Sequence, residues 1–292
     1  MIADLKVYAI GFSIFFMLIS CYSIEITQDE KPLIACSLQP QLYYIEKIVG
    51  NKASAFALLP PNASAEHFEI KPRDLVKLQK SKIWVTIGGL FLFERRSIQK
   101  ISRMNNTPKI IDSSEGIIFT AENQTRHHEK NIHDDPHIWL SPRLMKIQAE
   151  NFYKALITMD SKNTDYYTHN FLSLIQELET LDTYIKNRLQ NMRRKKFIVF
   201  HPSWGYFARD YGLQQIAIEH EGKEPGIKYM KLIIDKAREE GLRTLFIDPQ
   251  LSMKQAELIA REINGRLIVI DPLTKNYNEN LKKFANILAN NE

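Results

Sequence analysis

The sequence predicts an α/β fold of two similar lobes with parallel sheets, a clamshell joined by a long connecting helix. Short apolar segments alternate with helical patterns over residues 33–112, and the same alternation returns over 197–270. Strands that alternate with helices are typical of parallel βαβ units. Between these stretches, a helical pattern over 164–192 far exceeds the roughly 11–12 residues of an average helix. It predicts a strut between two halves.

The elements of the first half follow from apolar runs and the residues that end them. The opening apolar strand, 33–38, precedes a helical pattern over 39–49 that stops at Gly50, and glycine commonly ends helices. Prolines and glycines close the next apolar runs, as expected for turns. Further strands are expected at 53–59, 83–87 and 109–112, and further helices at 71–79 and 92–104.

The second half repeats this pattern after two helical segments, 141–159 and 164–192. Its expected strands are 197–200, 215–218, 245–247 and 267–270. One helix is expected to end at Tyr211, and two more are expected at 226–240 and 254–263. The chain is therefore expected to divide into a signal segment (1–21), an N-terminal α/β lobe (32–160), a connecting helix (161–194) and a C-terminal α/β lobe (195–290).

The charge pattern gives no reason to expect a nucleic-acid partner. The net charge of +5 is spread along the 292 residues, and the densest basic run, 193–196, directly precedes an apolar strand. No aromatic residues alternate with these charges, so a solvated helix end is the better interpretation.

The first residues predict export. Lys6 is followed by the segment 7–20, fourteen residues with no charge, and a polar stretch comes later at 28–31. A run this short indicates a secretory signal, because a membrane-spanning helix needs roughly 20 apolar residues. Residues 18–21 also fit a lipoprotein signal in which Cys21 is lipidated, with ordinary cleavage nearby as the alternative. The mature chain is expected in the periplasm or lipid-anchored on the outer face of the membrane. Cys36, in an apolar strand, is expected to be buried, and without a partner cysteine it forms no disulfide framework.

Three histidines in widely separated loops predict a metal site. His67, His137 and His201 each lie within a few residues of a proline, near the expected ends of strands or helices. Neutral imidazole is the commonest metal ligand, and three of them that leave one position open suit zinc. In a clamshell, all three loops can face one cleft. Unrelated surface or capping histidines are the alternative interpretation.

A carboxylate is a candidate for the fourth ligand. Glu66 adjoins His67, whereas Asp248 and Asp271 each follow an expected strand. Capping of a helix by a carboxylate at a strand end is the alternative role for each. Of the three, Glu66 and Asp271 are the stronger candidates.

Three further histidines lie close together in the loop before His137. His127, His128 and His133 form a cluster in a charged loop, where they either capture zinc loosely or are simply solvated.

A zinc hydrolase needs a general base at the open coordination position, and Glu66 is available. However, the sequence contains no His-Glu-x-x-His motif, no catalytic serine or cysteine pattern and no glycine-rich phosphate loop. We therefore do not expect an enzyme.

Several segments together resemble the zinc-binding receptors of bacterial ABC importers, the ZnuA-like proteins. The similarity spans nearly the whole chain from about residue 32, and its motifs appear in the order typical of that family. The segments that carry it are 58–61, 66–67, 71–74, 135–142, 201–207, 247–250 and 270–273.

The resemblance implies that His67, His137 and His201 are the zinc ligands and that Glu66, Asp271 or water takes the fourth position. Manganese-selective relatives place a carboxylate where this chain has His201, and manganese favours oxygen whereas zinc favours nitrogen. The family also implies a rigid connecting helix, modest lobe movement and delivery to a membrane permease. The chain departs from it in two ways: the loop before His137 holds only three histidines, and a second-lobe disulfide of some members is missing.

The expected function is that of a high-affinity zinc-binding receptor that delivers Zn2+ to the permease of an ABC importer. Zn2+ is then the transported ligand rather than a resident cofactor, and the protein is expected to be a monomer. Two alternatives stay open: a manganese or iron receptor with the same fold, and a surface adhesin in which the metal is structural.

Overall fold

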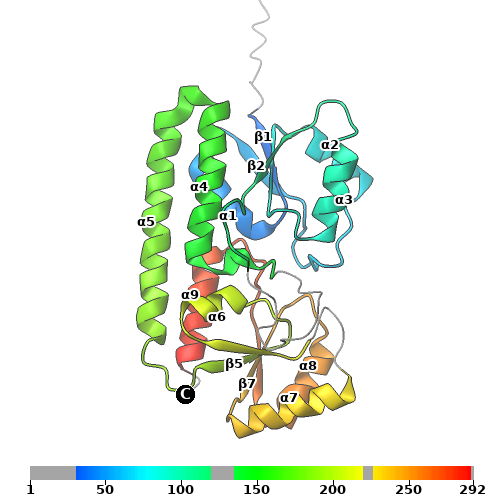
Figure 1. The fold of residues 1–292 in the computed structure, drawn as a ribbon, viewed down its shortest axis with the longest axis vertical. Coiled ribbons are helices and arrows are strands. Elements are labelled where there is room, and N and C mark those ends of the chain that lie inside the picture. The colour runs from blue at the N-terminus through cyan, green and yellow to red at the C-terminus, as the bar shows by residue number, and fades with distance from the viewer. Residues whose placement is uncertain (1–30, 120–134, 220–225, 291–292) are drawn as a thin grey trace, which may run out of the picture. The chain divides into compact units, whose positions relative to one another are not determined.

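The computed structural model describes residues 31–119, 135–219 and 226–290. The described residues from Pro32 onward form one compact unit. Two parallel four-stranded sheets with helices on both faces make up this unit (Figure 1). This arrangement confirms the predicted α/β class with two similar lobes. The predicted signal segment, 1–21, and the histidines at 127, 128 and 133 lie outside the described residues.

The first sheet has the strand order β2-β1-β3-β4. All of its pairs are parallel, and Ile34 pairs with both Ala55 and Ile83. Every residue of β3 is buried, because helices cover both faces of the sheet. The strands are β1 (Leu33–Cys36), β2 (Ser54–Ala57), β3 (Ile83–Thr86) and β4 (Lys109–Asp112), and the helices between them are α1 (Gln39–Val49), α2 (Pro72–Gln79) and α3 (Leu92–Ile101).

The second sheet repeats this topology with the order β6-β5-β7-β8, again entirely parallel. Its central strand β7 is buried along its whole length, like β3. The strands are β5 (Lys196–Val199), β6 (Gln214–Ala217), β7 (Thr244–Ile247) and β8 (Arg266–Val269), and the helices are α6 (Gly205–Asp210), α7 (Ile227–Glu239), α8 (Met253–Glu262) and α9 (Tyr277–Ala289).

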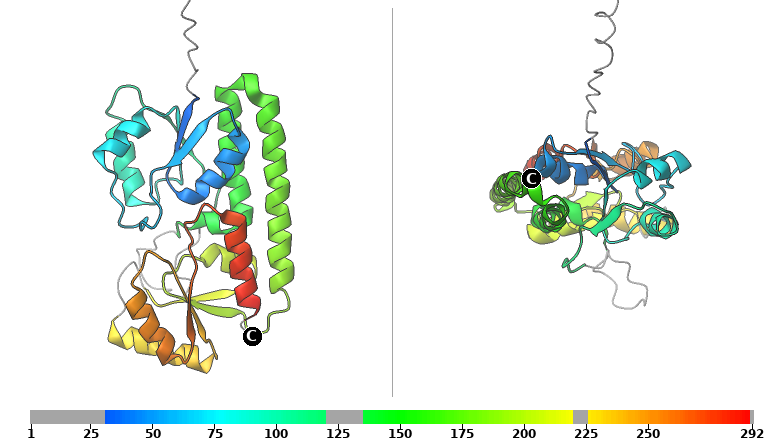
Figure 2. Two further views of the ribbon diagram at one scale, coloured as in Figure 1. Left: turned by 180° about the vertical axis from the view of Figure 1, so that it is seen from behind. Right: turned by 90° about the horizontal axis from the view of Figure 1, so that it is seen from above.

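Two longer helices lie between the sheets in the sequence. A short 3-10 turn, η1 (Ile138–Leu140), leads into α4 (Pro142–Met159), and a second turn, η2 (Ser161–Asn163), leads into α5 (Thr164–Leu189). The 26 residues of α5 correspond to a length of about 39 Å. This helix runs beside both sheets (Figures 1 and 2), which is the placement expected of a helix that connects two lobes.

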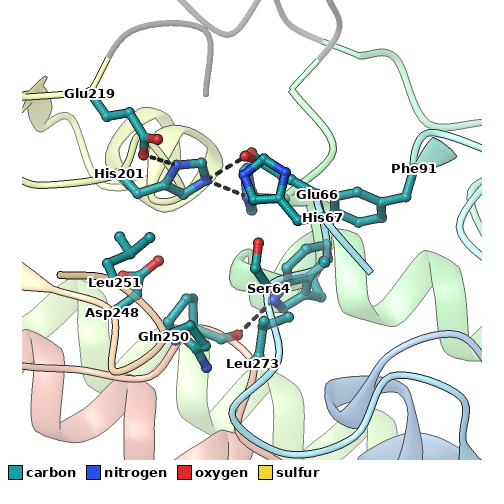
Figure 3. Close-up of a pocket in the computed structure, with 14 residues that line it drawn as sticks. Ser64, Glu66, His67, Phe91, His201, Glu219, Asp248, Gln250, Leu251 and Leu273 are labelled. Carbon is teal, nitrogen blue, oxygen red and sulfur yellow. Dashed lines mark hydrogen bonds and ion pairs between the residues drawn. The ribbon is translucent and has the colours of Figure 1, made fainter. Parts of the chain in front are cut away.

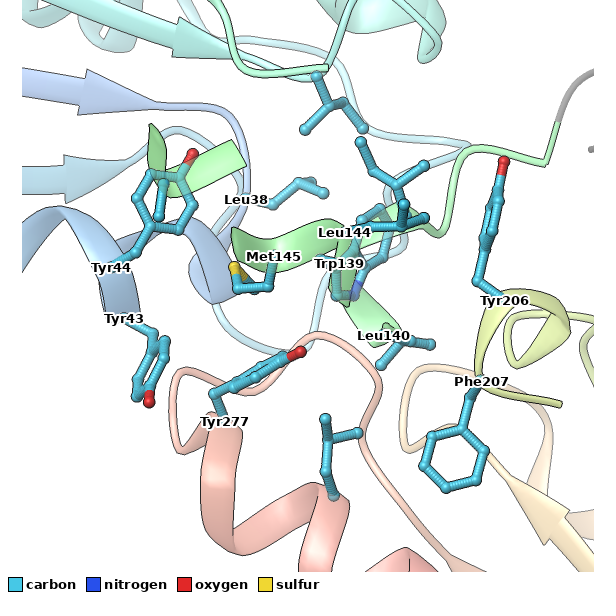
Figure 4. Packing of buried hydrophobic residues seen from close by; sticks show 14 of the residues in the cluster. Leu38, Tyr43, Tyr44, Trp139, Leu140, Leu144, Met145, Tyr206, Phe207 and Tyr277 are labelled. Carbon is cyan, nitrogen blue, oxygen red and sulfur yellow. The ribbon is translucent and has the colours of Figure 1, made fainter. Parts of the chain in front are cut away.

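A single hydrophobic cluster extends through both halves. It joins residues on one face of each sheet to α1, α4, α5 and α9, and its centre holds Tyr43, Trp139, Leu144, Phe207 and Tyr277 (Figure 4). The opposite faces have smaller clusters of their own, one under α2 and α3 and one under α7 and α8. The rings of Tyr43 on α1 and Tyr277 on α9 lie 4.9 Å apart. The two halves therefore share one hydrophobic core.

Most predicted element boundaries differ from the structure by only a few residues. The strands are shorter than the apolar runs, since those runs continue into buried loops such as Leu58–Leu59. Helix α9 was not predicted. Its buried residues Leu281, Phe284, Ala285 and Leu288 follow helical spacing, so the signal was present among polar neighbours.

Candidate metal site

The three predicted histidines lie in one pocket at the carboxyl ends of the strands. Glu66 and His67 come from the loop between β2 and α2, His137 precedes η1, and His201 follows β5. Residues from both halves of the chain line this pocket, including Phe91, Trp139, Asp248 and Leu273. Figure 3 draws Glu66, His67 and His201 among the side chains that line the pocket. The structure thus brings His67 and His201, which are 134 positions apart in the sequence, into the lining of one pocket.

Two distances from Nε2 of His201 match the edge length of the coordination tetrahedron of a metal ion. Nε2 of His201 lies 3.3 Å from Nε2 of His137 and 3.3 Å from Oε1 of Glu66. Two ligand atoms about 2.0–2.1 Å from a zinc ion, at the tetrahedral angle, stand about 3.3 Å apart. His137 and His201 are buried, whereas His67 is exposed.

Each buried histidine has a carboxylate on its other ring nitrogen. Nδ1 of His137 lies 2.8 Å from Oδ1 of Asp135, and Nδ1 of His201 lies 2.7 Å from Oε2 of Glu219. An ionised carboxylate can only accept a hydrogen bond, so in the neutral ring Nδ1 carries the proton and Nε2 keeps a lone pair for an ion. The carboxylates thus select the tautomer that a metal requires when the imidazole is neutral.

The surrounding charges favour a cation in the pocket. Burial lowers the pKa of His201, but the hydrogen bond to Glu219 and the nearby carboxylates Glu66 and Asp248 outweigh that effect and raise the pKa to about 9. Burial raises the pKa of Asp248 to about 7, although the two neighbouring histidines act to lower it. Without a metal ion, the carboxylates of the pocket therefore favour the protonated form of His201.

The three candidates for the fourth ligand differ in position. Glu66 faces Nε2 of His201, and Asp248 is buried in the pocket wall. Asp271, among the described residues, is not one of those that line the pocket. Its Oδ1 accepts hydrogen bonds from the backbone N–H of Leu273 at 3.0 Å and from Nε2 of Gln250 at 3.1 Å.

The analysis of the sequence missed Glu219 and the role of Asp135. Asp135 is two residues before His137, a spacing that lets its carboxylate accept hydrogen bonds from both the backbone N–H and Nδ1 of that histidine. Glu219 is 18 residues from His201. Its position just after an apolar strand was the available signal, the same one that identified Asp248 and Asp271.

Comparison with known families bears directly on this pocket. The family model for ZnuA, "Zinc-uptake complex component A periplasmic", matches residues 34–291. The chain belongs to this family. Its members are transport components that act outside the cytoplasm, which confirms the expected zinc-binding receptor, the expected extracytoplasmic location and the absence of an enzymatic role. Delivery to a permease and the identity of the ligands stay predictions.

Individual relatives agree with the family assignment. The chain is 25% identical to the high-affinity zinc uptake system protein ZnuA of Bacillus subtilis, over 85% of this chain and 80% of that protein. It is 40% identical to a ZnuA of known crystal structure, with a TM-score of 0.83 over 89% of this chain and 99% of that one. A deletion mutant of ZnuA with zinc bound is also 40% identical, with a TM-score of 0.82 over 89% of this chain and 98% of that one.

No helix in the described parts of the chain is both long and apolar enough to cross a membrane.

Proposed function

We propose that the protein is the receptor of a zinc importer, which binds one Zn2+ ion between its two halves and delivers it to an ABC permease. The observation that carries the proposal is the position of Nε2 of His201, which lies 3.3 Å from both Nε2 of His137 and Oε1 of Glu66, the length of one edge of a zinc tetrahedron. In the bound state, His67, His137 and His201 supply nitrogen ligands and Glu66 supplies an oxygen ligand.

Titration of the metal-free protein with zinc, in competition with a chromophoric chelator, tests this site. One equivalent is expected to bind tightly, and the double variant His67→Ala/His201→Ala is expected to lose that binding. His169→Ala is the matched control, because His169 is exposed on α5 outside the residues that line the pocket. A double variant that keeps the affinity of the unmodified chain would overturn the proposed site.

Selectivity for zinc over manganese is supported by the donor set. Buried nitrogen donors on His137 and His201 suit zinc, whereas manganese binds best to oxygen. Competition between the two ions for the metal-free protein is expected to leave zinc bound in the presence of excess manganese. Preferential binding of manganese would instead support the alternative receptor with the same fold.

Delivery to a permease separates the receptor from an adhesin with a structural metal. A bacterial strain that lacks this chain is expected to grow poorly under zinc limitation, and the unmodified chain is expected to restore growth. The His67→Ala/His201→Ala variant should not restore it. Equal rescue by both proteins would contradict a role in zinc delivery.

We also propose that the mature chain is exported, either released into the periplasm or lipid-anchored through Cys21. Both forms are compatible with the polar stretch that follows residue 20. The mass of the mature protein distinguishes them, since lipidation adds acyl chains to an N-terminal cysteine. A mature protein that retains residues 1–20 would contradict both.

A further inference from the structure

Glu219 contacts Nδ1 of His201, whereas His137 and Glu66 lie 3.3 Å from Nε2 of the same ring. We propose that Glu219 is a positioning residue, which holds Nε2 of His201 in the ligand position and so sets the preference of the pocket for a cation that favours nitrogen. This inference rests on the proposed function, because it assigns a role within the same zinc site.

While Glu219 keeps this contact, it occupies Nδ1 of His201 and leaves Nε2 for the ion. Oε2 of Glu219 lies 2.7 Å from Nδ1 of His201, whereas Glu66 and His137 both lie 3.3 Å from Nε2. The two nitrogens of an imidazole ring point in divergent directions. The ion and Glu219 therefore use different ring nitrogens of His201, although oxygens of Glu66 and Glu219 and a ring nitrogen of His201 lie within 4.8 Å of one another.

The protein backbone fixes this pair at the edge of the second sheet. His201 and Glu219 follow the adjacent parallel strands β5 and β6. The backbone pairing extends beyond the two strands. The backbone N–H of Glu219 donates to the carbonyl of Phe200 at 2.8 Å. The side chains of His201 and Glu219 are only 9% and 11% exposed. Little water therefore competes for Nδ1, and the backbone hydrogen bond keeps the two residues on neighbouring strand ends.

The effect on ligand strength has a direct chemical cause. A carboxylate that accepts the Nδ1 proton increases the electron density on the ring and makes Nε2 a better donor, besides fixing the tautomer and the orientation. A stronger nitrogen ligand increases the affinity for zinc more than the affinity for manganese, because manganese binds mainly to oxygen ligands. Loss of the Glu219 charge is thus expected to weaken zinc binding and to narrow the difference between the two metals.

Glu219→Gln tests the proposal, since the amide keeps the size of the side chain and removes its charge. Zinc affinity is expected to fall about ten- to a hundredfold, with a smaller loss for manganese. The d–d absorption bands of the Co2+-loaded protein are expected to shift, because the His201 ligand changes. Glu240→Gln is the matched control: Glu240 forms an ion pair with Lys196 in the same half of the chain but does not line the pocket.

A double-mutant cycle with His201→Ala separates positioning from a general structural role. If Glu219 acts through His201, Glu219→Gln should cost little further zinc affinity once the imidazole is gone. Additive losses, or an unchanged cobalt spectrum in Glu219→Gln, would overturn the proposal, as would a metal-bound structure in which Glu219 is a ligand. Failure of the unmodified chain to bind zinc would instead contradict the proposed function, so the two failures are distinguishable.

Discussion

Glu94 is a fully buried carboxylic acid on α3, away from the metal pocket. Its two oxygens accept hydrogen bonds from the backbone N–H groups of Ile87 at 3.0 Å and Gly89 at 2.9 Å. Burial raises the pKa of Glu94 from 4.5 to about 7, although these hydrogen bonds act to lower it. The carboxyl group therefore connects the backbone of the turn after β3. At alkaline pH the group is ionised, and its buried charge lowers the stability of the fold.

This pKa makes stability depend on pH in a defined direction. Because the folded protein binds the Glu94 proton more tightly than the unfolded chain, the contribution of Glu94 to stability rises as pH falls from above 7 towards 4.5. The difference across that range is on the order of 1 to 3 kcal/mol. His201 and Asp248 also have raised pKa values, and they act in the same direction in the metal-free protein.

Urea unfolding of metal-free protein at several pH values from 5 to 8 tests the contribution of Glu94. The Glu94→Gln variant keeps one oxygen acceptor and has no proton to gain, so the change of its unfolding free energy with pH should be smaller than in the unmodified chain. Glu240→Gln, on the surface of the second half, should retain the full dependence. Identical pH profiles for Glu94→Gln and the unmodified chain would contradict the assignment.

The carboxylates near the pocket should differ in their effect on zinc affinity. Glu66→Gln is expected to cause the largest loss because Glu66 faces Nε2 of His201, and Asp248→Asn a smaller one through loss of a nearby charge. Asp271→Asn is expected to have the least effect, since Leu273 and Gln250 already engage its carboxylate. Zinc titrations of the three variants give the order. A larger loss for Asp271→Asn would show that its carboxylate moves to the ion on binding.

Sequence reasoning at the residue scale succeeded where a single local feature identified the residue. Each of the three histidines could be recognised from its own loop, whereas the role of Glu219 depends on the pairing of β5 with β6. Nothing in the sequence around Glu219 shows which side chain it will contact. The choice among Glu66, Asp248 and Asp271 was left open for the same reason, because it depends on side-chain directions.

At the scale of elements, the first turn of α6 supports the metal site indirectly. A Cβ atom on Gly205 would come within 2.5 Å of Oδ2 of Asp135, whose other carboxylate oxygen holds Nδ1 of His137. The hydroxyl of Tyr206 on the same helix donates to the backbone carbonyl of Asp135 at 2.9 Å. The start of α6 thus shapes the space in which Asp135 and His137 are held.

Gly205→Ala is therefore expected to displace the Asp135 carboxylate and to reduce zinc affinity about tenfold or more, by loss of the contact to His137. Zinc titration and the spectrum of the Co2+-loaded variant measure the effect. Gly226→Ala is a suitable control, because Gly226 precedes α7 and a Cβ there would meet nothing within 4 Å. Equal affinities in the two variants would show that Asp135 can shift without consequence.

Sequence reasoning at the scale of elements was most reliable where apolar periodicity was strong. The long helix α5 and the parallel strands were recognised because their buried positions form regular patterns. Helix α9 was missed because asparagine and lysine residues separate its apolar positions. The order of strands within each sheet could not be obtained from the sequence, since it depends on which crossovers place β1 and β5 inside their sheets.

At the scale of the whole molecule, the shared hydrophobic cluster predicts that the two halves unfold together. Residues from α1, α4, α5, β5 and α9 belong to the same buried cluster, so loss of one half exposes much of the other. Polar contacts add to this connection. Tyr43 on α1 donates to Asn278 on α9 at 2.9 Å, and Lys47 pairs with Glu177 on α5 at 2.7 Å.

Two variants that each keep one tryptophan test this cooperativity. Trp84 lies on β3 of the first sheet and Trp204 just before α6 in the second half, so each reports on one half after the other two tryptophans are replaced by phenylalanine. Their fluorescence transitions in urea are expected to coincide. Separate midpoints would instead show that the predicted lobes, 32–160 and 195–290, unfold as independent domains.

The spacing of Nε2 atoms in the pocket has a consequence for the rate at which the cargo leaves. A site whose donors already stand where the ion needs them loses little freedom on binding, so tight affinity takes the form of a long residence time. Spontaneous dissociation is then expected to be slow. If the chain delivers zinc to a permease as proposed, we expect docking to speed release by moving His137 and His201 apart, which a faster loss of bound zinc in the presence of the permease would show.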